Sequence, residues 1–128
     1  MQNPDEQVAT FTEPTPYAFI DYQYDSAKTA IYPEAGTGSQ LALAYCALGL
    51  GEAGEVQNKI KKVIRDNEGI ITVDAISEIT KELGDILWYI AAMCREIGVP
   101  MHMIAELNIQ KLRQRQLDDK LKGSGDNR

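Results

Sequence analysis

Two pairs of acidic residues, set in helical sequence patterns, constrain this chain more than any other feature. Glu52 and Glu55 stand three residues apart, and further along the chain Glu82 and Asp85 repeat that spacing. Residues three apart lie on neighbouring parts of one face of an α-helix. Each helix can therefore present two carboxylates together, and antiparallel packing of the two helices would bring all four to one place.

Four neighbouring carboxylates need a counter-charge, because burying unpaired charge is expensive. Such a group must be protonated, solvated or neutralised by a cation. Carboxylate oxygens suit a hard divalent ion such as Mg²⁺, or Mn²⁺ in its place. A single E-x-x-E on a helix usually points into water, so residue chemistry alone leaves both a metal site and a solvated acidic face open.

The spacing of apolar residues predicts four helices and only weak strand signals. The first is expected over 16–32, after Thr15 as its N-cap and before Pro33, since proline disfavours helix in the residue ahead of it. The others are expected over 40–65, 73–97 and 100–121. The predicted fold class is therefore all-α, like a four-helix bundle.

The second helix carries an acid on its apolar side. Its expected buried residues are Leu41, Ala44, Leu48, Val56, Ile60 and Val63. At 100° per residue, Glu52 falls within the same arc, where a charged group is unusual. The third helix is expected to begin after Thr72 as its cap, and the fourth to turn Ile104, Leu107 and Leu112 inward.

The length of 128 residues fits one domain. We expect that domain over 15–122, with a flexible N-terminal arm over 1–14 and a disordered tail over 123–128. Cys46 and Cys94 lie in apolar helical patterns, which predicts buried free thiols in a reducing compartment. One histidine and no closely spaced cysteine pair argue against a zinc site.

The net charge is −6, which argues against binding to nucleic acid or to an anionic membrane. The sequence begins without a signal-peptide pattern and contains no apolar run of membrane-spanning length. We therefore expect a soluble, cytoplasmic protein.

Basic side chains follow the acidic pairs at positions suited to phosphate. Lys59 comes four residues after Glu55, and Asn108, Lys111 and Arg115 share one side of the fourth helix. Metal ions held by carboxylates screen polyphosphate charge, and basic groups meet the rest of it. The combination favours phosphoryl chemistry.

The sequence segments around these residues resemble those of the MazG-like all-α nucleoside triphosphate pyrophosphohydrolases. The matching segments are ALGLGEAGEVQNKIKK, KELGDILWYIA and NIQKLRQR, and the preceding TAIYP is similar to small, phage-type, single-domain members. The likeness covers about Tyr17 to Arg115. Some members carry an extra acid where this chain has Gly51, so the number of metal ions is left open.

This resemblance implies Mg²⁺-dependent hydrolysis of a nucleoside triphosphate to the monophosphate and pyrophosphate. By position, Glu52, Glu55, Glu82 and Asp85 would be the metal ligands and catalytic acids. The phosphates would be met by Lys59, Asn108, Lys111 and Arg115. It also implies a homo-oligomer, a dimer or tetramer, whose sites neighbouring subunits complete.

The acidic motif does not indicate which base the nucleotide substrate carries. The likeness to phage-type members, which act in the host cytoplasm, favours a purine deoxynucleotide, with dGTP first. One alternative is a dCTPase- or dUTPase-like pyrimidine enzyme of the same superfamily. The other is a non-enzymatic helical interaction module whose acids are only a solvated face.

Overall fold

The structure is a computed structural model that describes residues 16–126, and this part of the chain is helical without any strand. The all-α fold class predicted from the sequence is thereby confirmed. The elements are α2 (Phe19–Ala27), α3 (Gln40–Gly49), the short 3₁₀ helix η1 (Leu50–Glu52), α4 (Ala53–Asp66), α5 (Val73–Ile97) and α6 (Met101–Leu117). The predicted arm over 1–14 lies outside the described residues.

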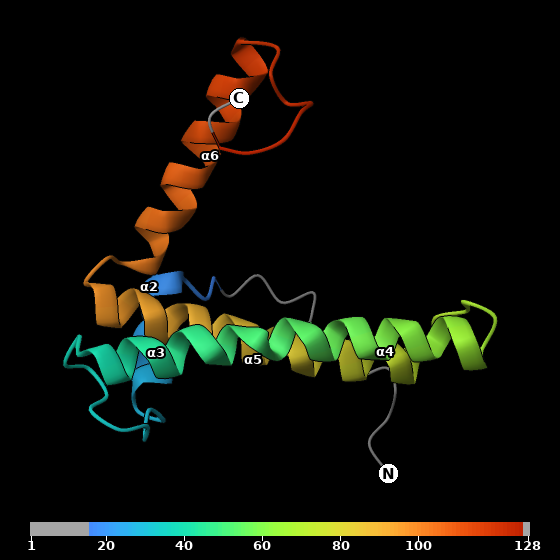
Figure 1. Cartoon of the computed structure of the whole chain (residues 1–128), viewed down its shortest axis with the longest axis horizontal. Helices are drawn as coiled ribbons and strands as arrows, with labels where there is room; N and C mark the ends of the chain where they lie inside the picture. Colours follow the sequence, from blue (N-terminus) through green and yellow to red (C-terminus); the bar gives the residue numbers. More distant parts are fainter. Residues whose placement is uncertain (1–15, 127–128) are drawn as a thin grey trace.

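A long helical hairpin dominates the shape (Figure 1). The segments α3, η1 and α4 follow one another nearly in line, and α5 runs back along all three of them. At one end of the hairpin α2 packs on α5. Helix α6 leaves that same end at a steep angle and contacts only α2 and α5 among the described elements. Within the described chain α6 therefore projects from the hairpin rather than lying along it.

Helix α5 follows the prediction over its whole length. It begins after Thr72, whose Oγ1 accepts a hydrogen bond from the amide of Ala75. It ends at Gly98, whose left-handed φ of 71° suits a residue without a side chain. Local capping chemistry thus fixed both ends, as the sequence indicated.

The first and fourth predicted helices are shorter than expected. Helix α2 begins at Phe19 after the extended Ala18, and the predicted cap Thr15 lies outside the described residues. It ends at Ala27, where the amide of Ala30 donates to the Ala27 carbonyl in a tighter turn. Helix α6 ends at Leu117 because Asp119 adopts a left-handed φ of 54° that the helix cannot continue.

The second predicted helix is interrupted rather than continuous over 40–65. The turn at Leu50–Glu52 is 3₁₀, and the amide of Ala53 donates to the Leu50 carbonyl across it. Glycines occur before, within and after this turn, and each weakens an α-helix by about 1 kcal/mol relative to alanine. A local change of helix type at this point is the result.

The buried core is small and lies where α2, α3 and α5 meet. One cluster consists of Tyr32, Ala42, Cys46 and Ala92, and a second of Ala91, Cys94 and Met101. The two cysteines are free and buried, as predicted, and burial raises the pKa of each thiol.

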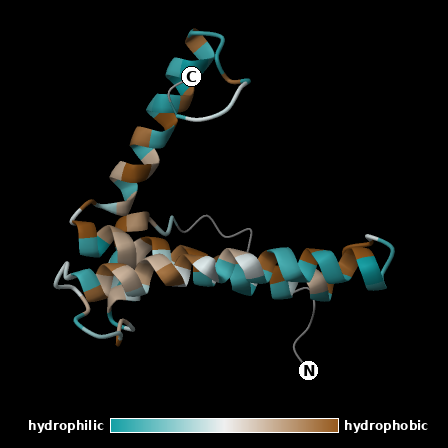
Figure 2. Ribbon diagram, viewed as in Figure 1, coloured by the Kyte–Doolittle hydropathy of each residue, from teal (hydrophilic) through white to brown (hydrophobic). Residues whose placement is uncertain are grey.

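Of the apolar residues expected to be buried, those on α4 (Val56, Ile60 and Val63) are half-buried, whereas those on α3 and α6 are exposed. Helix α3 buries Ala42 and Cys46, whereas Leu41 and Leu48 are 53% and 81% exposed. A helix that is apolar all round gives no periodicity from which to choose its inner face. The inward residues expected on the fourth helix are also exposed (Ile104, Leu107 and Leu112), and apolar segments recur along α6 in Figure 2. None of the described helices combines the length and hydropathy needed to cross a membrane.

Glu96 is a buried carboxylate that the sequence did not single out. Its oxygens accept hydrogen bonds from the Tyr32 hydroxyl at 2.5 Å and from the amides of Gly36 and Gly38 at 2.6 and 2.8 Å. Burial by itself would raise the pKa of Glu96, but these donors, with the nearby Arg95 guanidinium, hold it below the ordinary value. The carboxylate therefore fastens the loop that leads into α3.

Replacement of Glu96 tests this anchor. Glu96→Gln should lower the free energy of unfolding by about 1–3 kcal/mol, since the amide leaves a buried donor unmatched. The folded pKa lies below the unfolded value of about 4.3. The stabilisation by Glu96 is thus present above that pH and disappears as the pH falls through the folded pKa.

Urea unfolding at several pH values from neutral to acidic measures both effects. The difference in the free energy of unfolding between wild type and Glu96→Gln should become smaller as the pH falls. Glu106→Gln, at an exposed carboxylate on α6, is the matched control and should leave stability within about 0.5 kcal/mol. Equal stability of the Glu96 variant at neutral pH would contradict the anchoring role.

Candidate metal centre

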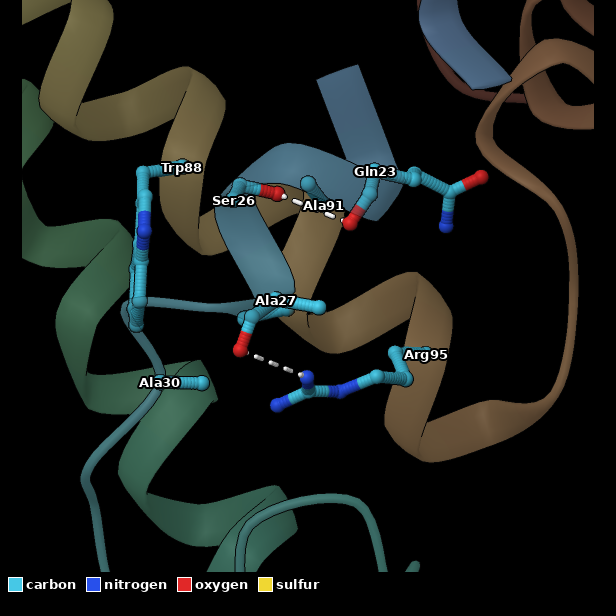
Figure 3. A pocket seen from close by; sticks show the side chains of 8 residues that line it. Gln23, Ser26, Ala27, Ala30, Trp88, Ala91 and Arg95 are labelled. Atoms are coloured by element: carbon cyan, nitrogen blue, oxygen red, sulfur yellow. Dashed lines mark hydrogen bonds between the residues drawn. The ribbon is translucent and has the colours of Figure 1, made fainter. Parts of the chain in front are cut away.

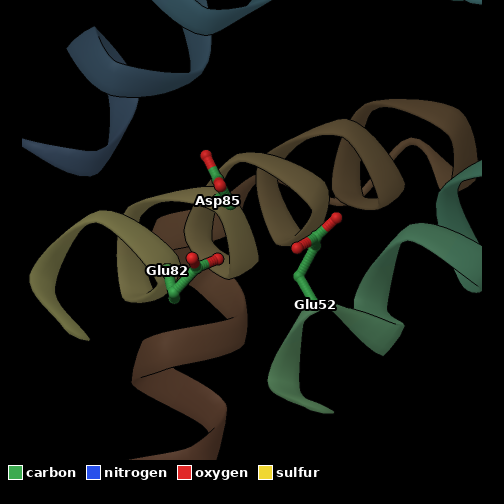
Figure 4. Close-up of side chains that lie close together, drawn as sticks. All are labelled: Glu52, Glu82 and Asp85. Atoms are coloured by element: carbon green, nitrogen blue, oxygen red, sulfur yellow. The ribbon is translucent and has the colours of Figure 1, made fainter. Parts of the chain in front are cut away.

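Three of the predicted acids meet between the two arms of the hairpin. One oxygen each from Glu52, Glu82 and Asp85 lies within 4.8 Å of the other two. Figure 4 shows Glu82 and Asp85 on α5, with Glu52 on the neighbouring segment. Residues distant in the sequence are brought together because η1 packs directly on α5.

The donor set fits a hard divalent cation. Oxygens around Mg²⁺ lie about 2.1 Å from the ion, so two of them are at most about 4.2 Å apart. The spacing of the three carboxylates is already close to that limit. Glu52 and Glu82 are half-buried and Asp85 is exposed, so the group is open on one side to a ligand.

Glu55 is not part of this three-carboxylate group, which differs from the predicted convergence of four acids. It lies in the first turn of α4 and is exposed. Glu52 closes the 3₁₀ turn η1, whereas Glu55 lies on α4, so these two acids do not share the face of one regular α-helix as Glu82 and Asp85 do.

Lys59 lies beside the group, as the sequence predicted for a phosphate-binding cation. Its Nζ is 3.4 Å from Glu82 Oε1 and 3.6 Å from Glu78 Oε2. Lys59 and Glu82 are both largely covered, with side chains 27% and 17% exposed. The lysine therefore supplies local positive charge at one edge of the acidic group.

The predicted phosphate contacts on α6 do not reach the acids within the described chain. Asn108 is exposed, and α6 does not contact η1 or α4. Lys111 Nζ and Arg115 Nη2 each lie 3.0 Å from Asp126 Oδ1. The described part of the expected tail, 123–126, thus lies along α6 and covers Arg115, which is 7% exposed.

Two aromatic residues beside the acids were not predicted as site residues. An open depression on the surface is lined by Glu52, Asp85, Trp88 and Tyr89. Burial, the nearby Tyr45, and the carboxylates of Glu52 and Asp85 raise the pKa of Tyr89. The only hint in the sequence was position, because Trp88 and Tyr89 follow Asp85 by three and four residues on one helix.

A much smaller cavity, also lined by Trp88, lies between α2 and α5 (Figure 3). Its wall includes Gln23, Ala27 and Arg95, and Arg95 Nη1 donates to the Ala27 carbonyl at 3.4 Å. Trp88 Nε1 donates to Thr29 Oγ1 at 2.8 Å. This cavity contains no group of acids, so the chemistry is concentrated at the open depression.

Comparison with known proteins agrees with the helical fold and the acidic group. Residues 40–118, more than half of the chain, match the MazG nucleotide pyrophosphohydrolase domain. The chain belongs to this family of nucleotide pyrophosphohydrolases. It is similar to the Gene 37 protein of Mycobacterium phage L5, with 41% identity over 109 residues that cover 84% of this chain and 96% of that protein. No solved structure matches the chain.

The family assignment confirms the resemblance seen in the sequence, including its likeness to phage proteins. A nucleotide substrate and a divalent metal are both consistent with it, and the three-carboxylate group supplies a place for that metal.

Asp85 offers a direct test of metal binding. Without metal, Asp85→Asn should leave the thermal midpoint unchanged or slightly higher, because neighbouring like charges are destabilising by about 0.5 kcal/mol. Mg²⁺ or Mn²⁺ at a hundred times its Kd should stabilise the wild type by about 2.7 kcal/mol. The variant should lose most of that gain.

Thermal unfolding followed by circular dichroism, with and without metal, measures the difference. Asp74→Asn, at an exposed acid in the first turn of the same helix, should keep the metal-induced shift. An identical shift in Asp85→Asn and wild type would place the metal elsewhere.

Proposed function

We propose that this protein hydrolyses a nucleoside triphosphate to the monophosphate and pyrophosphate in a Mg²⁺-dependent reaction, with a purine deoxynucleotide such as dGTP as the first substrate to test. The observation that supports this most directly is the group formed by Glu52, Glu82 and Asp85 beside Lys59. In a member of a pyrophosphohydrolase family, such a group offers oxygen ligands and an adjacent cation for phosphate.

The chain's residues would divide the work as follows. Glu52, Glu82 and Asp85 would hold the divalent ion, with Glu55 one turn away for a second ion. When bound, such an ion screens the charge of the triphosphate and makes a nearby water more nucleophilic. Glu52, which is half-buried, would accept the proton of the attacking water. Lys59 would exchange its contact with Glu82 for a phosphate oxygen.

Cleavage at the inner linkage is favoured over the outer one. Release of orthophosphate by P-loop enzymes uses a glycine-rich loop that ends in Lys-Ser or Lys-Thr. Here Gly49, Gly51 and Gly54 lie in helical segments, and no such ending follows them. The family assignment supports pyrophosphate as the leaving group.

Product analysis tests the reaction. Incubation with dGTP and Mg²⁺ should give dGMP and pyrophosphate in one step, without dGDP, and excess EDTA should abolish turnover. Phosphorus NMR distinguishes the products, and a panel of purine and pyrimidine triphosphates compares substrates. Accumulation of dGDP with orthophosphate would rule out inner cleavage, and no turnover of any triphosphate would favour the non-enzymatic alternative.

We also propose that the active protein is a homo-oligomer. Helix α4 buries none of its residues fully, and its apolar side forms an open groove that includes Val56, Ile60 and Ile64. Much of α6 is exposed and apolar as well. Packing of a second copy on these faces would remove apolar surface from water, and it would allow α6 of one subunit to bring Asn108, Lys111 and Arg115 to the acids of another.

Mixing two inactive variants tests a shared site. Asp85→Asn removes a proposed metal ligand, and Lys111→Glu reverses the charge of an exposed side chain on α6. Each variant alone should lose most activity. After denaturation and refolding together in equal amounts, a dimer with shared sites should recover roughly a quarter of wild-type activity, because half of the dimers are mixed and each has one intact site.

Light scattering at micromolar protein should report at least a dimer. The two variants refolded separately and mixed afterwards serve as the control. Full activity from a clean monomer would contradict the proposal.

A further inference from the structure

The depression beside the acids has two chemically different walls. Carboxylates of Glu52 and Asp85 form one, and the aromatic rings of Trp88 and Tyr89 form the other. A nucleoside triphosphate has the same division, with a charged phosphate chain at one end and a flat apolar base at the other. The carboxylate wall is the part that the proposed reaction already uses.

Tyr89 has a fixed position because α3 provides a gap for its ring. A Cβ atom on Gly49 would lie 2.1 Å from Tyr89 Cδ1 and Cε1 and 2.6 Å from Cγ. Any residue other than glycine would therefore push the whole ring aside. The last residue of α3 thus sets the place of an aromatic ring next to the acids.

Trp88 is held equally well. Its Nε1 donates to Thr29, so the indole nitrogen already has a partner and the ring cannot turn freely. The Trp88 and Tyr89 rings meet edge to face, with centroids 5.1 Å apart and planes at 83°. Tyr32 and Tyr45 support them from behind, with centroids 6.1 Å from Trp88 and 6.4 Å from Tyr89 respectively.

We propose that the nucleobase stacks on the ring of Tyr89, with Trp88 standing nearly perpendicular beside it, while its phosphates lie on the acids, which makes Gly49 and Tyr89 specificity-determining residues. This assignment rests on the proposed function for its phosphate end. Stacking on aromatic side chains tolerates every base, because each has a π-face.

The two rings contribute area rather than a hydrogen-bonding pattern. The indole N–H is already used, and the Tyr89 hydroxyl is paired with Tyr45. Larger bases therefore gain more, and purine triphosphates should bind more tightly than pyrimidine ones. The Kd values of adenine and guanine triphosphates should differ less from each other than either differs from that of a cytosine or uracil triphosphate.

Trp88 is the single tryptophan of the chain, so its fluorescence reports binding directly. The α,β-methylene analogue of dGTP, which cannot be cut at the inner linkage, should quench this fluorescence saturably in the presence of Mg²⁺. Inorganic triphosphate has the charge but no base and should quench little. Equal quenching by both ligands, or none by the analogue, would overturn the assignment.

Substitutions separate the ring from its hydroxyl. Tyr89→Leu removes the ring and should raise the Kd of the analogue roughly fivefold to a hundredfold, the range expected for one stacked base. Tyr89→Phe keeps the ring and should stay within about threefold of wild type. Gly49→Ala should resemble Tyr89→Leu, whereas Gly54→Ala, where a Cβ meets nothing within 4 Å, should bind normally.

Inorganic triphosphate should compete with the analogue equally well in all four variants, which shows that the acidic wall is intact. A loss in Tyr89→Phe as large as in Tyr89→Leu would assign the effect to the hydroxyl and overturn stacking. The reaction and the base surface can fail separately. Quenching without hydrolysis would refute the proposed reaction alone, and hydrolysis with an unchanged KM in Tyr89→Leu would refute the base surface alone.

Discussion

Repulsion among three carboxylates is the constraint on which the rest of this structure depends. Their oxygens lie within 4.8 Å of one another, and like charges at that distance favour separation unless positive charge is close. Lys59 supplies part of it through Glu82. The antiparallel packing of η1 and α4 on α5 holds the acids together against this repulsion. Part of the folding free energy therefore offsets the repulsion, which a bound divalent cation would reduce.

The small core is the reason for proposing that this chain assembles. Within residues 16–126 seven apolar residues are buried, while much of α6 presents large apolar side chains to solvent and the apolar side of α4 is only half-buried. The core gathers at one end of the hairpin, where Glu96 fastens the loop before α3. The candidate metal centre lies further along, at an open depression beside α5. A second copy on these faces would complete both the packing and the site.

Gly49 and the 3₁₀ turn that follows it have a specific role in the interrupted helix. At Gly49 the absence of a side chain admits the ring of Tyr89, and the 3₁₀ turn that follows places Glu52 opposite α5. The same short segment therefore positions both an acid and an aromatic ring at the depression. A regular α-helix of ordinary residues would have displaced the ring of Tyr89.

The sequence by itself determined the helices, the extent of α5 and the acids, because capping, periodicity and residue spacing are local properties of the chain. It also carried the family resemblance that the comparisons confirmed. Only the tertiary structure decided that Glu55 stands apart from the other acids, that α6 projects away, and that Tyr89 sits on Gly49. These features depend on contacts between residues far apart in the sequence and on a change of helix type. A uniform helical periodicity of 100° per residue reveals neither.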